Sequence, residues 1–375
     1  MTRQTASEGL EEEVDSSLSD EMMWLHEHVL QRHSTVHRIA VALYDSRHDL
    51  LKTYVNSSDV PNPLSLYQQP LDEMPSLSDL AQRHASRVIS DLAQLPGPHA
   101  EHTRWLIGQG YRSSYTVPMY QSGGLLGFVF FDSRVPGAFD GGLTADLQIY
   151  VQLCRMSVLN VVNLAHAVQA IVKVARNLTH LRDIETGRHL DRMSSYCRLI
   201  ARGVAKHYGC DDEYIEHLYL FSQLHDIGKV GISDSILLKP GRLTDDERLI
   251  VQGHVELGVQ LVDEVMKNAG LVETRYLSMM RNVVHCHHEF MDGSGYPRGL
   301  AGDALPLEGR IGTIADIFDA LTSERPYKRP WSNDEALGEL MRMKDAGKLD
   351  PHCVSALVNA RDEVRDIQQK FGLIA

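Results

Sequence analysis

The chain has 375 residues, of which 43% are apolar and 23% charged, as in an ordinary globular protein of about two or three domains. This composition excludes a collagen-like, low-complexity or wholly disordered chain. Fifty Asp and Glu against 37 Lys and Arg give a net charge of −13, which excludes a surface built to coat a nucleic-acid polymer. A small anionic ligand fits this charge if a few cations or metal ions gather in one cleft.

Neither a membrane segment nor a disulfide framework is expected. The longest strongly apolar run, Leu125–Phe131, contains Gly127 and is far shorter than the roughly 20 residues of a membrane span. The five cysteines are scattered without a C-x-x-C pair, so we expect reduced thiols. The first 15 residues include five Asp or Glu, whereas a signal peptide begins with a positively charged segment. These features predict a cytoplasmic protein that contacts no membrane.

The pattern of the first 142 residues predicts an acidic tail and then an α+β domain. Residues 1–20 are polar and acidic, and we expect them to be disordered. Over residues 21–142 we expect an antiparallel sheet with helices on its faces. The expected helices cover 20–31, 77–84 and 99–110, and the expected strands cover 39–43, 51–55, 115–120 and 125–132, the last two as a hairpin.

The hairpin SSYTVPMYQSGGLLGFVFFDS leads into a long helix, and this order of elements resembles a GAF sensor domain. The Asn-Lys-x-x-Phe-Asp-Glu pattern of cyclic-nucleotide-binding GAF domains does not occur in the sequence. The resemblance therefore implies a GAF-like sensor domain but no particular ligand. A dimerisation module without a ligand is an equal alternative.

Residues 143–178 predict one long linker helix, because no Pro or Gly occurs from Leu143 to Leu181. Mostly apolar residues, several of them β-branched, recur along it at four-three spacing, at positions 147, 151, 154, 158, 161, 165, 168, 172 and 175. This seam predicts a parallel two-stranded coiled coil and hence a homodimer. The alternative is that one half of the helix packs on the sheet of its own chain.

Histidines and carboxylates accumulate in the second half of the chain. Glu185 and His189 are four residues apart in an expected helix, so their side chains leave the same face. The further candidates are His225, Asp226, His254, His287, His288 and Asp316. Imidazole with carboxylate suits iron, manganese or zinc, whereas calcium and magnesium prefer oxygen ligands. Eight such groups exceed what one tetrahedral ion uses, which predicts two or three divalent ions.

Four motifs follow one another in this half: HDIGK (225–229), KPGRLT (239–244), HHEFMDGSGYP (287–297) and ALTSERPYK (320–328). Together they strongly resemble the HD-GYP family of cyclic di-GMP phosphodiesterases, a subgroup of the HD metal-dependent phosphohydrolases. The resemblance covers about residues 175–360. It implies an all-α helical bundle over residues 179–375 that hydrolyses cyclic di-GMP to pGpG and then to GMP.

The resemblance also implies a set of metal ligands. His189, His225, Asp226 and Asp316 would form the core site, and Asp226 would bridge to a second ion held by His254, His287 and His288. Glu185 matches a ligand of the third ion in trinuclear members. A solvated charge that pairs with Arg182 or His189 is the alternative for Glu185. Iron or manganese is the expected metal. Cys286 is expected to pack in its helix, and contact with a metal is the alternative for it.

Substrate contacts follow from the same motifs. Lys229 is expected to add a cation at the phosphate and thus to share the catalytic role with His225 and Asp226. By resemblance, Tyr296 lines the cleft, and Arg325 and Lys328 contact the substrate; a solvated loop is the alternative for these two cations.

Two further carboxylates are expected to orient neighbouring groups. Asp319 would do so through a ligand histidine or Lys229, and Asp292 lies beside the glycine loop.

Gly293, Gly295 and Pro297 predict a tight loop. In the family such a loop is credited with contacts to diguanylate cyclases, so a rival hypothesis is a catalytically silent module that binds cyclic di-GMP or a cyclase. All eight candidate ligand positions and Lys229 are filled, which favours the enzyme. Related cyclic dinucleotides such as cyclic GMP-AMP are alternative substrates.

Overall fold

The computed structural model describes residues 18–58, 60, 63–97, 99–121, 124–178, 187–268, 275–324 and 329–373, and the chain divides into two compact units. The first unit holds residues 18–161 with 211–213, and the second holds the described residues 162–210 and 214–373. No helix in these ranges is long and apolar enough to cross a membrane.

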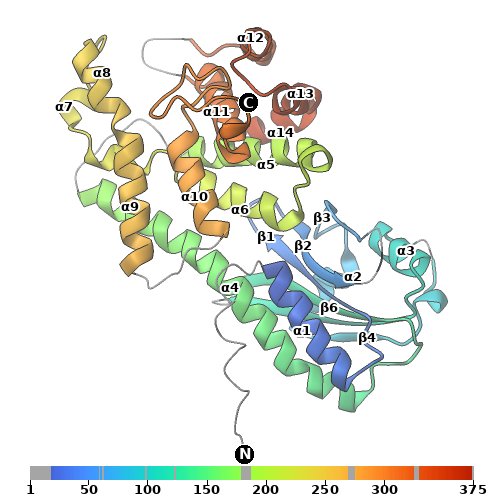
Figure 1. Cartoon of the computed structure of the whole chain (residues 1–375). Helices are drawn as coiled ribbons and strands as arrows, with labels where there is room; N and C mark the ends of the chain where they lie inside the picture. The colour runs from blue at the N-terminus through green and yellow to red at the C-terminus, as the bar shows by residue number, and fades with distance from the viewer. Residues whose placement is uncertain are drawn as a thin grey trace, which may run out of the picture. The chain divides into compact units, whose positions relative to one another are not determined.

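A six-stranded antiparallel sheet forms the centre of the first unit, in the order β3-β2-β1-β6-β5-β4 (Figure 1). Its strands are β1 Arg38–Asp45, β2 Leu50–Ser58, β3 Gln68–Pro70, β4 Arg87–Ile89, β5 Ser113–Gln121 and β6 Gly124–Ser133. The predicted hairpin is β5–β6, paired from Ser113 opposite Ser133 to Gln121 opposite Gly124. The α+β prediction is confirmed, and the three-residue strands β3 and β4 at the two edges are additions to it.

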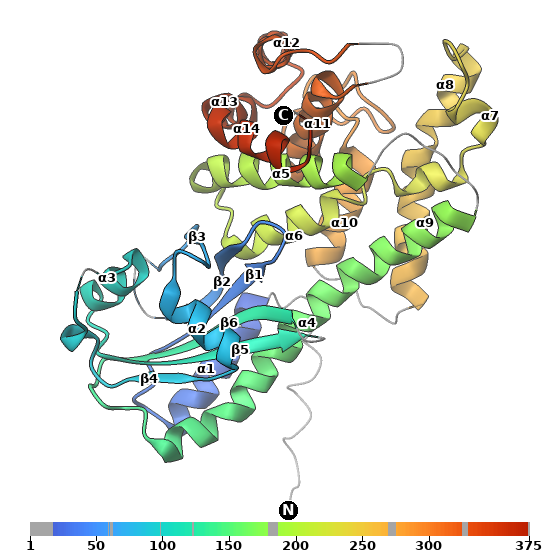
Figure 2. The ribbon, with the colours of Figure 1, turned by 180° about the vertical axis from the view of Figure 1, so that it is seen from behind.

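Helices cover both faces of this sheet because its central strands are apolar on both sides. The helices before the linker are α1 Leu18–Arg32, α2 Pro75–Arg83 and α3 Glu101–Gly108, with a short 3-10 turn, η1 Leu92–Gln94. Leu77 and Leu80 of α2 pack in one cluster with Ala42, Leu51 and Phe128. The two views show α1 and the linker helix on the opposite face (Figures 1 and 2).

The N-terminal boundary differs slightly from the prediction. Helix α1 begins at Leu18, so residues 18–20 are helical and are not part of a disordered tail. Residues 1–17 lie outside the described ranges.

The predicted linker helix is α4, Gly141–Leu178, and the structure resolves the two alternatives for the first half of its seam. Leu147, Val151, Cys154 and Val158 are buried in the first unit. The Sγ atom of Cys154 lies 3.6 Å from Sδ of Met22 on α1. These four positions therefore pack within their own chain, and the coiled-coil prediction is wrong for them. The side chains of the later seam positions lie outside the described residues.

The second unit is helical, as predicted. After α4 its elements are α5 Gly187–Tyr208, α6 Asp212–Ser222, η2 Ile227–Gly231, α7 Asp234–Leu237, α8 Asp245–Gln252, α9 His254–Asn268, α10 Arg275–Cys286, η3 Gly302–Ala304, α11 Leu307–Thr322, α12 Asn333–Asp345, α13 Pro351–Asn359 and α14 Arg361–Lys370. An isolated bridge pairs Asp292 with Ala301.

Helix α5 lies against α11, α13 and α14 in the core of this unit. Met193, Tyr196, Cys197 and Ile200 are fully buried at helical spacing on one face of α5. The ring of Tyr196 meets the edge of Phe318 on α11 at a centroid distance of 5.2 Å. This packing fixes α5 and α11, two of the elements that carry candidate ligands.

Candidate metal centre

Seven of the eight predicted ligands come together in the second unit, from five separate places in the chain. They form two groups, and within each group the ligand atoms all lie within 4.8 Å of one another. The first ligand group is His189, His225 and Asp316, and the second ligand group is Asp226, His254, His287 and His288. Glu185 lies outside the described residues.

Close packing between η2 and α9 joins these segments. Gly228, just after the His225–Asp226 pair, lies directly on the start of α9, where a Cβ atom would collide with the carbonyl oxygen of His254 and the backbone nitrogen of Gly258. Only glycine therefore allows Asp226 to approach His254 this closely. The glycine of the HDIGK motif thus has a packing role in the site.

Backbone carbonyls fix the orientation of three histidines. In each, Nδ1 lies within hydrogen-bond distance of the carbonyl oxygen three residues earlier: 3.0 Å from His225 to Ser222, 2.6 Å from His254 to Val251 and 2.9 Å from His287 to Val284. A carbonyl oxygen only accepts, so Nδ1 carries the proton. The lone pair of each imidazole is then on Nε2, which is the arrangement of a metal-bound histidine.

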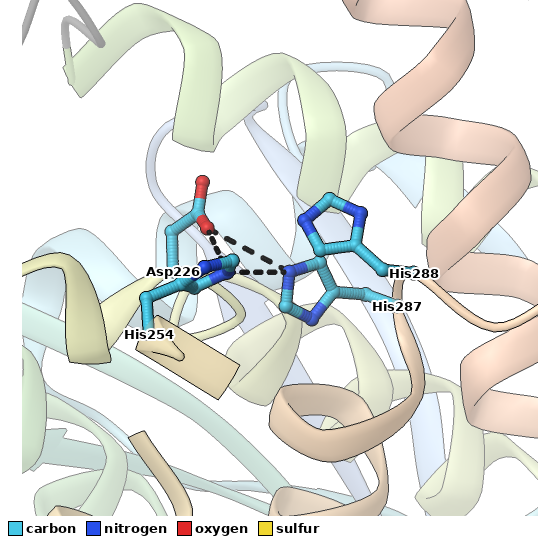
Figure 3. Close-up of side chains that lie close together, drawn as sticks. All are labelled: Asp226, His254, His287 and His288. Carbon is cyan, nitrogen blue, oxygen red and sulfur yellow. Dashed lines mark hydrogen bonds and ion pairs between the residues drawn. The ribbon is translucent and has the colours of Figure 1, made fainter. Parts of the chain in front are cut away.

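The second ligand group has the dimensions of a site for a divalent ion (Figure 3). Asp226 Oδ1 lies 3.1 Å from His254 Nε2 and 3.6 Å from His287 Nε2, and the two Nε2 atoms are 3.4 Å apart. Two ligands bound at about 2.1 Å to one ion are themselves about 3.0–3.4 Å apart. The Asp226–His254 and His254–His287 separations lie in this range and the Asp226–His287 separation is slightly longer, so the residues present fit a divalent ion.

Buried atoms without a hydrogen bond give the same result. Asp226 Oδ1 and His189 Nε2 are buried and have no hydrogen-bond partner. Buried polar atoms in native proteins nearly always have a partner, and one that lacks it calls for an explanation. A metal ion is the partner that a carboxylate oxygen and an imidazole lone pair can share.

Asp226 lies between the two groups and presents one oxygen to each. Oδ1 faces His254 and His287, whereas Oδ2 lies 3.1 Å from His225 Nε2 and 2.6 Å from Lys229 Nζ. In the first ligand group, His189 Nε2 lies 4.0 Å from Asp316 Oδ1. With one oxygen directed at each group, Asp226 has the position that a carboxylate bridging two ions requires.

The charges of these groups suit metal binding. Burial opposes ionisation of Asp226, but Lys229 and His225 outweigh it and hold the pKa of the carboxyl well below its usual value. Burial lowers the pKa of His287, and it lowers the pKa of His288 well below the usual value. The carboxylate is therefore charged and these imidazoles are neutral at neutral pH, which are the forms that bind metals.

Asp319 supports the first ligand group from behind. It is fully buried, and its carboxylate accepts from His189 Nδ1 at 2.7 Å and from Arg192 Nε at 2.6 Å. Burial raises the pKa of Asp319, but His189 and Arg192 outweigh it and keep the pKa below the usual value. Asp319 thus contacts one of the two partners expected for it. Arg192 was not predicted, although it follows His189 by three residues on the same helix.

The structure places the other predicted residues as follows. The Tyr296 ring lies 4.7 Å from that of His288, and burial and Asp226 raise the pKa of its hydroxyl. Asp292 is exposed and accepts from the backbone nitrogen and the hydroxyl of Ser294, so it orients its own loop. Cys286 is buried, burial raises its pKa to about 12, and it belongs to neither ligand group. Arg325 and Lys328 lie outside the described residues.

Sequence reasoning also missed Glu289. This residue is 1% exposed and follows the two histidines directly. Its Oε1 accepts from the backbone nitrogen of Arg298 at 2.7 Å and its Oε2 from that of Leu300 at 3.1 Å. Its place in the HHE motif was visible in the sequence, but no local pattern pointed to partners nine and eleven residues later.

Residues 173–353 match the HD domain family model. This part of the chain is similar to the HD domain family, and it contains the HDIGK and GYP motifs on which the resemblance to the HD-GYP group rests.

Curated relatives share this region. The chain is 39% identical over 205 residues to the cyclic di-GMP phosphodiesterase response regulator RpfG of Xanthomonas campestris, covering 54% of this chain and 50% of that protein. It is 39% identical over 223 residues to the 3'3'-cGAMP-specific phosphodiesterase 2 of Vibrio cholerae, covering 59% and 38%. A cyclic di-GMP phosphodiesterase of Thermotoga maritima is 35% identical over 201 residues, covering 53% and 51%. The chain therefore spans about half or less of the length of these relatives.

Solved structures that are similar to part of this chain include GAF domains. The GAF domain/HD domain protein from Geobacter sulfurreducens is 16% identical, with a TM-score of 0.32 over 38% of this chain and 93% of that chain. The GAF domain from an Acinetobacter phosphoenolpyruvate-protein phosphotransferase is 19% identical, with a TM-score of 0.31 over 42% and 88%.

Proposed function

We propose that this chain is a metal-dependent phosphodiesterase that hydrolyses cyclic di-GMP. The observation that carries the proposal is the gathering of seven metal-ligand side chains in two neighbouring groups, with Asp226 between them. The names of the relatives, which include cyclic di-GMP phosphodiesterases at 35–39% identity, support the substrate.

A phosphodiester is an anion and repels an attacking hydroxide. Divalent ions bound at the two groups would hold the phosphate oxygens, lower the pKa of a shared water and offset charge in the transition state. The backbone carbonyls and Asp319 keep the histidine lone pairs directed at this chemistry. Lys229 offers an ammonium beside the bridging carboxylate, and Tyr296 lies next to His288, where it would contact the substrate.

The finer features remain part of the proposal. The products are pGpG and then GMP, Arg325 and Lys328 contact the substrate, and the metal is iron or manganese. Glu185 holds a third ion, so Glu185→Ala lowers the metal content of the protein by about one ion per chain. An unchanged metal content would make Glu185 a surface charge and the site binuclear.

The first unit regulates the enzyme in this proposal, and the chain works as a homodimer in the cytoplasm. The loop around Gly295 is the candidate contact for a diguanylate cyclase. A silent binding module is the weaker alternative, because no described ligand position has been lost. A 3'3'-cGAMP phosphodiesterase is the second candidate activity, since three relatives at 33–39% identity bear that name.

The test is turnover of both cyclic dinucleotides by protein purified without oxygen or chelators, with its metal content measured by elemental analysis. We expect hydrolysis of cyclic di-GMP that stops after chelation and returns with Fe²⁺ or Mn²⁺. His225→Ala is the control and should lose metal and turnover together. Metal-loaded protein that binds cyclic di-GMP without cleaving it would make the chain a silent module, and faster cleavage of 3'3'-cGAMP would favour the second activity.

A further inference from the structure

The loop that follows the histidine pair lies directly on the backbone of the pair. A Cβ atom at Gly295 would come within 2.6 Å of the carbonyl oxygen of His288 and within 2.5 Å of Glu289 Cα. The backbone nitrogen of Tyr296 donates to the same carbonyl oxygen at 3.1 Å. The loop therefore holds Tyr296 against His288, a member of the second ligand group.

A second contact fixes the returning half of this loop. The buried Glu289 carboxylate accepts from the backbone nitrogens of Arg298 and Leu300, with one oxygen for each. No cation forms an ion pair with Glu289 among the residues that the structure describes. A buried carboxylate is costly unless it is hydrogen-bonded, and bonds to a charged acceptor are the strong ones.

The backbone of Glu289 also has a contact with helix α11. The hydroxyl of Thr313 on α11 lies within hydrogen-bond distance of the carbonyl oxygens of His287 and Glu289, at 3.0 and 3.2 Å, and of its own-helix carbonyl at Gly309, at 2.9 Å, and its one proton is shared among them. This contact helps to fix the backbone of Glu289, and thereby the position of its carboxylate. A separate local turn, in which Asp292 accepts from the backbone nitrogen and the hydroxyl of Ser294, closes the other half of the loop.

We propose that Glu289 is a positioning residue: by binding the N–H groups of Arg298 and Leu300 it anchors the loop and keeps Tyr296 in place beside His288 for substrate binding. Glu289 does this without binding a metal ion itself. The substrate part of this inference rests on the proposed function, whereas the anchoring part does not.

The charge of Glu289 is essential to this role. Glu289→Gln has the same shape, but its amide offers one acceptor and one donor, so one of the two N–H groups faces another donor. Glu289→Asp keeps the charge but is one methylene too short to reach both groups. Asp292→Asn is the matched control, because it alters an exposed carboxylate of the same loop.

The first experiment is amide hydrogen exchange on the full chain, with metal and after chelation. In Glu289→Gln the amides of Arg298 and Leu300 should exchange about tenfold faster or more, the effect of one lost bond to a buried charge. Asp292→Asn should leave both rates unchanged. Unchanged exchange at both amides in Glu289→Gln would overturn the anchor, whatever the substrate is. Glu289→Asp provides the same measurement if the glutamine variant does not fold.

The second experiment is a double-mutant cycle on cyclic di-GMP hydrolysis. Glu289→Gln should raise KM about tenfold with metal content unchanged, because the lost bond is a binding effect transmitted through Tyr296. In a Tyr296→Ala background the same substitution should change KM less than twofold. Equal effects in both backgrounds, or a loss of metal, would give Glu289 a general structural role and overturn the inference. If the parent protein cleaves no cyclic di-GMP, the proposed function fails while the exchange experiment still decides the anchor.

Discussion

The ammonium group of Lys229 lies 2.6 Å from the bridging carboxylate of Asp226. In the proposed hydrolysis, negative charge concentrates on the phosphoryl oxygens during attack, so a cation at this place would stabilise the transition state more than the bound substrate. Lys229→Ala should retain fold and metal but lose about 10²–10³ of its rate, the usual effect of removing one such donor.

The measurement is single-turnover hydrolysis beside equilibrium binding of cyclic di-GMP. Binding should weaken less than the rate falls. Lys239→Ala is the control, because that lysine pairs with Glu247 at the start of α8. Hydrolysis at the parent rate in Lys229→Ala would show that this lysine only pairs with Asp226.

Asp319 makes a different prediction, which concerns metal affinity. Its carboxylate accepts the Nδ1 proton of His189 and so fixes the orientation of the ring and leaves the lone pair on Nε2. Asp319→Asn should bind the metal about 10–100-fold more weakly, as substitutions of such supporting carboxylates do. Competition with a chelator measures this directly. Ser323→Ala removes a weaker bond to the same carboxylate at 3.1 Å, and an equal loss in that control would contradict a role through His189.

Helix α13 offers a prediction at the scale of one element. Asp350 is 2% exposed and caps this helix through the backbone nitrogens of His352 and Cys353. It also accepts from Tyr208 on α5 and Arg310 on α11. Asp350→Asn should lower the free energy of unfolding of the second unit by about 2 kcal/mol, because a buried charged acceptor is lost.

The effect of Asp350 depends on pH with a definite sign. Burial raises the pKa of this carboxyl, but its hydrogen bonds outweigh burial and the pKa is lowered. A carboxyl whose pKa is lower in the folded than in the unfolded protein stabilises the folded state at pH values above its unfolded pKa of about 3.9. This stabilisation is lost as the pH falls through the folded pKa. Urea unfolding should therefore show the full difference between parent and variant at pH 7 and a smaller one below about pH 4. A difference independent of pH would contradict the assignment.

At the scale of elements, the sequence predicted the parts whose signal is local. The hairpin β5–β6 and helix α4 are such parts. Strands β3 and β4 were missed because three residues are too few to show an alternation. The first four positions of the α4 seam were assigned to the wrong partner, because a four-three pattern shows that a face is buried but not which chain buries it.

The candidate site divides in the same way. Its ligand types and order were visible as motifs, and the structure brings seven of the eight together. The contacts that hold them were not visible. The pairs Arg192–Asp319 and Glu289–Leu300 depend on how α5, α11 and the loop pack, and they join residues 127 and 11 positions apart. Such contacts have no periodicity in the sequence.

At the scale of the whole molecule, every described candidate ligand lies in the second unit, and the first unit has a sheet and core of its own. The described ligands and the sheet thus belong to different units, as the proposal of a regulatory first unit and a catalytic second unit requires. If the proposed homodimer pairs through α4, it needs a side of α4 that the packing on the sheet leaves exposed.

The exposed side of α4 provides the last prediction. Ile149, Leu153 and Met156 are 64%, 38% and 59% exposed, and they repeat the four-three spacing on a side of α4 that the unit does not bury. If the proposed homodimer pairs through α4, Ile149→Glu should convert it to a monomer in light scattering at micromolar concentration while the helical content stays unchanged. Leu147→Glu should instead unfold the first unit, because it buries an unpaired charge. Gln152→Glu adds the same charge at a neighbouring position of α4 and serves as the control. A parent protein that is monomeric at this concentration, or an Ile149→Glu dimer as stable as the parent, would rule out α4 as the contact.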